Sequence, residues 1–139
     1  MKEQYSSETS KPMSQKNHEA KKVDFKIRYR FFNKQEGGRV LSPNQGYRCD
    51  FSYEGDDIQK TGVFMIWPEF EDESGHLVRP ERPVLAKGIA RMRIVNPAQR
   101  GYHQKRIKVG VIGYLMEGSR KVAECEVTEV IDLLANPAI

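Results

Sequence analysis

Apolar and polar residues alternate with a period of two along most of the chain after Val23. The first such run directs four side chains to one face, those of Phe25, Ile27, Tyr29 and Phe31. Successive side chains of a β-strand point to opposite faces, so each alternating run predicts a strand with one buried face. The inward-facing residues expected of five further strands are Tyr47, Cys49, Phe51 and Tyr53; Val63 to Trp67; Ala90, Met92 and Ile94; Ile107, Val109 and Val111; and Ala123, Cys125 and Val127.

Turn-forming residues separate these runs, and no segment of useful length has a helical period, although Ile131 to Leu134 can form one turn. We therefore expect an all-β protein. Six strands with short connections are most simply closed into a small antiparallel barrel, because closure leaves no unpaired edge. An open sandwich is the alternative. The expected turns are Gly37-Gly38, Pro43-Asn44, Gly55-Asp56, Asn96-Pro97 and Gly118-Ser119.

The N-terminal segment has a different composition from the rest. Residues 1–22 are polar, and we expect them to form a flexible, disordered tail ahead of a barrel domain, residues 23–134. No apolar run approaches the roughly 20 residues that a membrane-spanning helix needs, and no secretory signal is recognisable. Cys49 and Cys125 lie on expected strands without the spacing of a zinc site, which indicates two small buried side chains. These features predict a cytoplasmic protein without a membrane partner.

The positive charge of the chain is small. The formal net charge is +4, and residues 1–22 hold five lysines against three glutamates. So thin an excess does not by itself indicate a nucleic-acid-binding protein.

Four segments carry a more specific signal. They are Glu36-Gly37-Gly38-Arg39, Gly46-Tyr47-Arg48-Cys49-Asp50-Phe51, Glu117-Gly118-Ser119-Arg120 and the closing strand from Val122 to Ile131. Their order and spacing resemble the C-terminal β-barrel domain (the third domain) of bacterial elongation factor Tu, over roughly residues 25 to 131. The resemblance implies a six-stranded barrel without catalytic activity. In the family this domain contacts the T stem of aminoacyl-tRNA, packs against the GTPase domain and helps to bind the nucleotide-exchange factor.

The rest of that factor is missing from the chain. No Gly-rich phosphate-binding loop with its Lys-Ser/Thr pair occurs in the sequence, so we expect neither nucleotide binding nor GTPase activity.

The resemblance also implies roles for individual residues. Arg39 matches an arginine of the family whose guanidinium can bridge phosphate oxygens. Thr61 keeps a hydroxyl that can donate to a phosphate. Glu117 and Gly118 keep a turn that approaches the ribose-phosphate chain, where a carboxylate can accept from a 2′-hydroxyl.

Two positions depart from the pattern of the family. Asp50 stands in place of a neutral glutamine, and Asn96 stands in place of a basic residue before the proline. The first change sets a negative charge beside a polyanion, which costs about 1 kcal/mol or more in a partly desolvated interface. The second removes a phosphate contact, so both changes weaken the expectation of tRNA binding.

Two charged segments lie outside these motifs. A basic cluster surrounds Tyr102, which suits a phosphate backbone with a stacked base, and a plain solvated loop is the equal alternative. An acidic insertion, residues 68–82, raises the question of a metal site, but it lacks the alternating spacing and glycine turn of a calcium loop, which favours a solvated loop. For Trp67, a core or barrel-rim position is favoured over an exposed contact. The basic cluster comprises Arg100, His103, Gln104, Lys105, Arg106 and Lys108, and the acidic residues are Glu69, Glu71, Asp72 and Glu73.

The sequence thus predicts a non-enzymatic binding module related to translation, with no cofactor, no metal and no catalytic residues. The preferred hypothesis is a protein-interaction adaptor, or a mimic of the surface that elongation factor Tu offers its partners. The alternative is a protein that binds tRNA-like or ribosomal RNA. The candidate RNA- or partner-binding residues are Arg39, Tyr47, Arg48, Asp50, Thr61, Asn96, Arg100, Lys105, Arg106, Glu117, Gly118 and Arg120.

Overall fold

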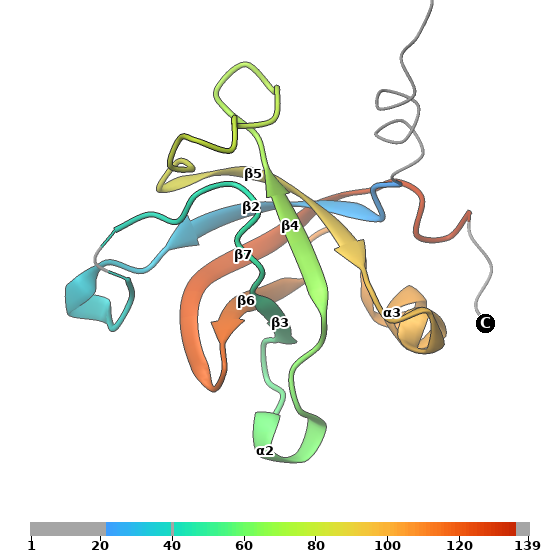
Figure 1. Ribbon diagram of the computed structural model, residues 1–139. Helices are drawn as coiled ribbons and strands as arrows, with labels where there is room; N and C mark the ends of the chain where they lie inside the picture. Colours follow the sequence, from blue (N-terminus) through green and yellow to red (C-terminus); the bar gives the residue numbers. More distant parts are fainter. Residues whose placement is uncertain (1–21, 40, 136–139) are drawn as a thin grey trace, which may run out of the picture.

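Six antiparallel strands form one sheet that curls into a half-barrel in the computed structural model (Figure 1). The structure describes residues 22–39 and 41–135, so the expected tail, residues 1–22, lies almost wholly outside the described residues. The strand order across the sheet is β3-β6-β7-β2-β5-β4. The strands are β2 (Phe25–Phe31), β3 (Asp50–Tyr53), β4 (Ile66–Phe70), β5 (Lys87–Ile94), β6 (Ile112–Glu117) and β7 (Arg120–Val130), and the α-helices are α2 (Ile58–Thr61) and α3 (Arg100–Arg106).

The period-two alternation is confirmed most clearly in the centre of the sheet. Strand β2 pairs with both β5 and β7, and its residues Phe25, Ile27 and Tyr29 are buried. Ala90 and Met92 of β5 are buried on the same side of the sheet. The inward face of the half-barrel is therefore the apolar face that the alternation predicts.

The expectation of a closed barrel is wrong. No ladder joins the two edge strands, β3 and β4, in residues 22–39 and 41–135; instead Phe51 of β3 and Phe64, two residues before β4, exchange backbone hydrogen bonds of 2.8 Å at an isolated bridge. Strand β3 is four residues long, which limits the ladder it can form. Phe64 and Phe70 direct their N–H groups away from β5, whereas Pro68 between them has no N–H to offer. The sheet therefore stays open along most of this edge.

A glutamine side chain covers part of the open edge. The Gln45 amide nitrogen donates to the carbonyl oxygens of Phe70, at 2.8 Å, and of Val78, at 3.0 Å. The Gln45 amide oxygen accepts from the backbone N–H of Phe70 at 2.8 Å. Gln45 thus satisfies the edge of β4 as a neighbouring strand would, which protects the edge from pairing with another chain.

The segment between β2 and β3 does not form the hairpin that the resemblance to elongation factor Tu implies at Glu36-Gly37-Gly38-Arg39. Residues Lys34–Glu36 form a single 3-10 turn, which is capped reciprocally by the side chains of Asn33 and Glu36. The next strand, β3, pairs with β6 rather than with β2. The hairpin expected at Gly118-Ser119 is confirmed, because Glu117 of β6 pairs with Arg120 of β7.

The expected starting points of two further strands are wrong. The strand expected at Ile107 begins at Ile112, and Val109 is 67% exposed. The strand expected at Val63 begins at Ile66.

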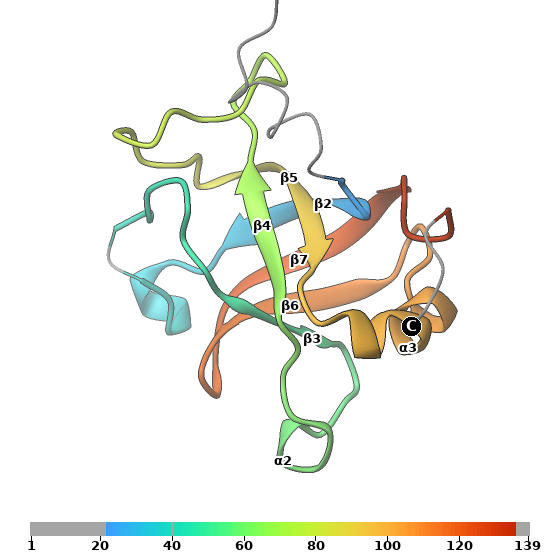
Figure 2. The same ribbon diagram turned by 45° about the vertical axis from the view of Figure 1, so that its right-hand side comes forward.

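A short helix, α3, replaces the expected loop and lies beside the segment that follows β7 (Figure 2). Its buried residues are Arg100 and His103, so no apolar stripe reveals it in the sequence.

Aromatic rings and two thiols fill the interior. The rings of Tyr29 and Phe70 pack edge to face with centroids 5.1 Å apart, as do those of Phe51 and Tyr53. Cys49 and Cys125 are buried and unbridged, as expected of small apolar side chains. Burial raises the pKa of both thiols, which keeps them neutral at ordinary pH.

Candidate interaction surface

Five of the predicted site residues converge at the tip of the β6–β7 hairpin. Glu117 accepts hydrogen bonds from the guanidinium of Arg39, at 2.5 Å, from that of Arg120, at 2.6 Å, and from the hydroxyl of Tyr47. Gly118 follows with a φ of 60°, in the left-handed region that the tight turn requires. We name Arg39, Tyr47, Glu117 and Arg120 the Glu117 cluster.

The carboxylate of Glu117 is ionised and fully engaged within the Glu117 cluster. Burial by itself raises the pKa of Glu117, but hydrogen bonds from Tyr47, Arg120 and Arg39 outweigh it and hold the pKa below its usual range. Burial raises the pKa of the Tyr47 hydroxyl, which remains a donor. The Arg39 guanidinium also stacks 5.0 Å from the centre of the Tyr47 ring. An internal carboxylate therefore competes with a phosphate for the Arg39 guanidinium.

Arg48 and Asp50 follow Tyr47, one residue of the Glu117 cluster, along the chain. Arg48 is exposed, and its guanidinium stacks 4.5 Å from the centre of the Trp67 ring. Asp50 begins β3 opposite Met116, and burial raises the pKa of its carboxyl. The negative charge at Asp50 is thus held at the edge of the sheet, close in sequence to the cluster.

The arginines of the basic cluster have structural roles. The buried Arg100 guanidinium donates to the buried carboxylate of Asp24. Arg106 donates to both oxygens of Asp56, at 2.9 and 3.1 Å. Lys105 is exposed, and α3 itself holds no carboxylate. Of the predicted binding residues in this segment, Lys105 is exposed, Arg106 is half-buried and Arg100 is buried.

Thr61 and Asn96 serve as local caps. The Thr61 hydroxyl donates to the carbonyl oxygens of Asp57 and Gly62 at the end of α2. The Asn96 side chain accepts from the N–H of Ala98 at the start of a 3-10 turn. Within residues 22–39 and 41–135, no hydrogen bond or ion pair links either residue to the Glu117 cluster.

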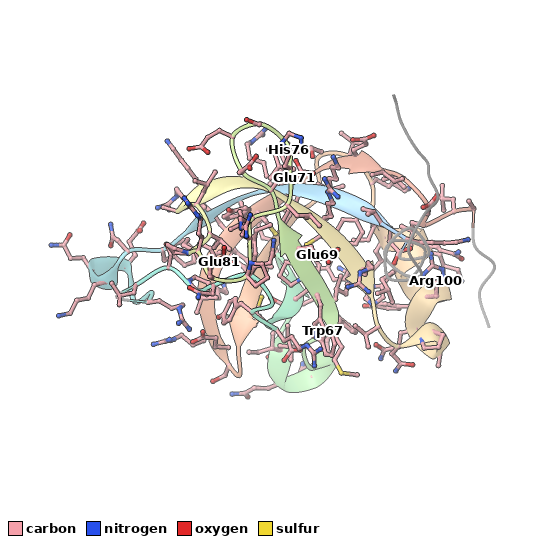
Figure 3. All side chains as sticks on the ribbon, turned by 45° about the horizontal axis from the view of Figure 1, so that its top comes forward. Trp67, Glu69, Glu71, His76, Glu81 and Arg100 are labelled. Carbon is pink, nitrogen blue, oxygen red and sulfur yellow. The ribbon has the colours of Figure 1, made fainter. Side chains whose placement is uncertain are left out.

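The acidic insertion is not simply a solvated loop. Its first residues belong to β4, and the structure places Trp67, Glu69 and Glu71 one after another along that strand and its end (Figure 3). Glu71 is buried and forms 2.9 Å ion pairs with Lys26 and Arg91. Burial raises the pKa of Glu71, but the two pairs outweigh this effect and lower it. In the part of the chain that the structure describes, no three acidic, histidine or cysteine residues gather as metal ligands.

The outer face of the sheet carries stripes of opposite charge. Strand β2 presents Arg28 and Arg30, which pair at 2.7 and 3.1 Å with Glu126 and Glu124 of the neighbouring β7. A hollow of about 620 Å³ lies over these residues, with Ile112 among its lining. The two arginines of this hollow are thus already matched by carboxylates of the neighbouring strand.

A second hollow lies at the other end of the outer face. It measures about 430 Å³, and we name it the Trp67 pocket. Its lining includes Lys22, Trp67, Arg93, Val95 and Arg100. Sequence reasoning assigned Trp67 to the core or rim and Lys22 to the tail, so it missed this hollow. The signal that brings Trp67 and Arg93 together is the strand register, in which the two are directly opposite, and no local pattern gives it.

A scan against protein-family models and a search of curated proteins each find no match to this chain. Among the described residues, no helix is long and apolar enough to cross a bilayer. The relation to elongation factor Tu therefore remains a resemblance carried by the motifs.

Proposed function

We propose that the chain is a non-enzymatic, cytoplasmic binding module related to translation, and that its partner is a protein. The resemblance to the third domain of elongation factor Tu supports the class of function. One observation favours protein over RNA: the arginines best placed for phosphate are held by carboxylates of the same chain, Arg39 by Glu117, Arg106 by Asp56 and Arg100 by Asp24.

An ordered cluster of this kind suits a protein interface. Arginine and tyrosine are enriched at the energetically important positions of such interfaces, where pre-ordered side chains lose little entropy on binding. Arg39 and Tyr47 are held rigidly by Glu117 and remain partly exposed. In this proposal the Glu117 cluster forms the contact, and the chain acts as an adaptor or as a mimic of the corresponding surface of elongation factor Tu.

Binding to the purified nucleotide-exchange factor of elongation factor Tu tests this proposal. We expect saturable binding, measured by fluorescence anisotropy of the labelled chain, and competition by intact elongation factor Tu. Arg39→Ala is expected to weaken binding by about tenfold, the effect of losing roughly 1.4 kcal/mol at an important interface residue. Arg79→Ala is the matched control, because Arg79 is an exposed arginine that pairs only locally with Glu81. Absence of binding, or equal effects of the two variants, contradicts the proposal.

RNA binding is the alternative, favoured by the net charge of +4 and the exposed Arg48 and Lys105. A salt series with bulk tRNA separates the two readings, since phosphate contacts make affinity fall steeply with salt. The protein reading predicts weak tRNA binding near physiological salt, unchanged by Asp50→Gln. It also predicts that Glu117→Gln, which releases Arg39, strengthens binding at low salt. Tight wild-type binding that Arg39→Ala weakens and Asp50→Gln strengthens favours the RNA alternative.

A further inference from the structure

A row of four side chains crosses the outer face of the sheet with an apolar residue at each end. Residues directly opposite one another on antiparallel strands point to the same face. The strand registers therefore set one row across β5, β2, β7 and β6, which consists of Ile89, Arg28, Glu126 and Ile112 in that order. We name it the Arg28 row. Its centre holds a cation and a carboxylate side by side.

The Arg28 row is open to solvent. All four of its residues line the hollow of about 620 Å³ on the outer face. The side chains of Arg28 and Glu126 are 60% and 39% exposed, and Ile112 is 37% exposed. A partner can therefore reach the charged centre and an apolar end of the row together.

The charged centre has hydrogen-bonding capacity left. Within residues 22–39 and 41–135, the Arg28 side chain donates through Nη2 to Glu126 at 2.7 Å and makes no other hydrogen bond. A guanidinium carries five N–H groups, so its Nε and Nη1 groups can donate to a second carboxylate. Glu126 accepts this bond through Oε1, which leaves Oε2 for a second guanidinium.

The order of the Arg28 row is self-complementary. A twofold axis that lies in the plane of the face, along the strands and between β2 and β7, exchanges the two sides of the row. When a second copy is placed by this axis, Arg28 of each copy faces Glu126 of the other. Ile89 of each copy then faces Ile112 of the other, so apolar ends meet apolar ends.

The rows on either side have the same order at their centres. The flanking pairs are Arg30 with Glu124 and Lys26 with Glu129. Three cations of β2 thus stand beside three carboxylates of β7, so the same twofold axis lays each basic stripe on an acidic stripe. Because the two stripes balance, they attract neither a uniformly acidic nor a uniformly basic partner, whereas this chain itself carries the matching order.

We propose that two copies of this chain pack through their outer faces, with the twofold axis between β2 and β7. Isoleucines of the two copies pack together, and each central arginine gains a carboxylate of the other copy. Stacked sheets keep their mean strand directions within about 30° of each other, which allows this arrangement. The Glu117 cluster contributes no residue to the Arg28 row, so the inference does not rest on the proposed function.

The expected dimer is weak. The face is four strands wide, at about 4.8 Å from strand to strand, which places it at the small end of specific interfaces. We expect a dissociation constant of about 10–100 μM. Sedimentation velocity of the full chain, from about 1 μM to about 500 μM, measures it as a monomer–dimer equilibrium.

A charge exchange between copies tests the geometry. Arg28→Glu makes the centre of the row acidic and Glu126→Arg makes it basic, so each variant alone should self-associate at least about tenfold more weakly. An equimolar mixture of the two variants should form a heterodimer, because each acidic centre then faces a basic one. The pair within each chain stays broken in both variants, so recovery on mixing reports the contact between copies.

Two further variants complete the test. Arg79→Glu is the matched control, since it makes the same change of charge at an exposed arginine that pairs locally with Glu81, and it should leave the dimer unchanged. Ile112→Ser removes an apolar end of the row and should weaken the dimer by about fivefold or more. Circular dichroism checks that each variant keeps the fold. If a charge variant loses it, Ile112→Ser decides, and an unchanged dimer in that variant overturns the inference.

Several other results overturn the inference. One is a chain that stays monomeric at about 500 μM. Others are equal effects of Arg28→Glu and Arg79→Glu, and a mixture of charge variants that associates no better than either variant alone. Failure of the exchange factor to bind removes the proposed function and leaves this inference standing, whereas absence of the dimer removes this inference alone.

Discussion

Replacing Arg100 by methionine tests whether this arginine stabilises the fold or is available to a ligand. The side chains of Arg100 and Asp24 are 11% and 4% exposed, so the ion pair is largely removed from water. Asp24 also accepts from the backbone N–H of Ile94 at 2.8 Å, and Arg100 donates to the carbonyl oxygen of Asp132 at 3.3 Å. The pair therefore ties α3 to the start of β2, the end of β5 and the segment after β7.

The expected loss of stability in Arg100→Met follows from the buried charge that this substitution leaves without a partner. Methionine keeps the apolar length of the arginine stem but leaves the Asp24 carboxylate buried without its cation. Breaking a buried pair in this way costs about 3–5 kcal/mol, out of a total free energy of unfolding of about 5–15 kcal/mol. The double variant Asp24→Asn/Arg100→Met removes both charges and keeps an acceptor for Ile94, so we expect it to recover about half of that loss or more.

Urea unfolding, followed by circular dichroism, measures these changes. The slope of the free energy against urea concentration is expected to stay constant, so that the change in midpoint reports stability alone. Lys105→Met is the matched control on the same helix, because Lys105 is exposed and its loss is expected to cost less than about 0.5 kcal/mol. The structural role of Arg100 is refuted if both single variants have the same stability, or if the double variant is no more stable than Arg100→Met.

Three further predictions concern the interior and the edge of the sheet. Burial lowers the pKa of His103 to about 4, so the unfolded chain takes up a proton first as the pH falls. The free energy of unfolding should decrease by up to about 3 kcal/mol from about pH 6.5 to pH 4, and pH-dependent urea unfolding of His103→Gln should lack this component. Gly113→Ala should lower the free energy of unfolding by about 2 kcal/mol, because the new Cβ would lie 2.5 Å from Phe51 Cζ. The control is Gly88→Ala, whose Cβ would meet no atom closer than 3.4 Å and which should lower stability less in the same assay. Gln45→Leu leaves without partners the backbone groups that the Gln45 amide satisfies, so it should destabilise the fold by about 2 kcal/mol. It should also increase light scattering at high protein concentration, because the edge of β4 is then uncovered. Unchanged scattering contradicts the edge-covering role of Gln45.

The convergence of residues in the Glu117 cluster was predictable from sequence where motif and hairpin coincide. Glu117, Gly118 and Arg120 lie within four consecutive residues, so the hairpin turn itself brings them together. Arg39 and Tyr47 join them through the fold, and only the resemblance indicated their placement. Arg100 and Arg106 were predicted as solvent-facing cations because a buried arginine in a short helix leaves no apolar period to read. Their partners, Asp24 and Asp56, lie 76 and 50 residues away in sequence.

The sequence by itself determined that the protein is built from β-strands with one apolar face. Alternation is a local property, since the side chains of neighbouring residues such as Phe25 and Lys26 must point to opposite sides of an extended backbone. Tertiary structure decided where the sheet ends and which charges meet. The opening between β3 and β4 follows from the short β3 and from Pro68, together with the side chain of Gln45. The pairing of Arg28 with Glu126, 98 residues away, and the meeting of Trp67 with Arg93 depend on strand register, which no local pattern specifies.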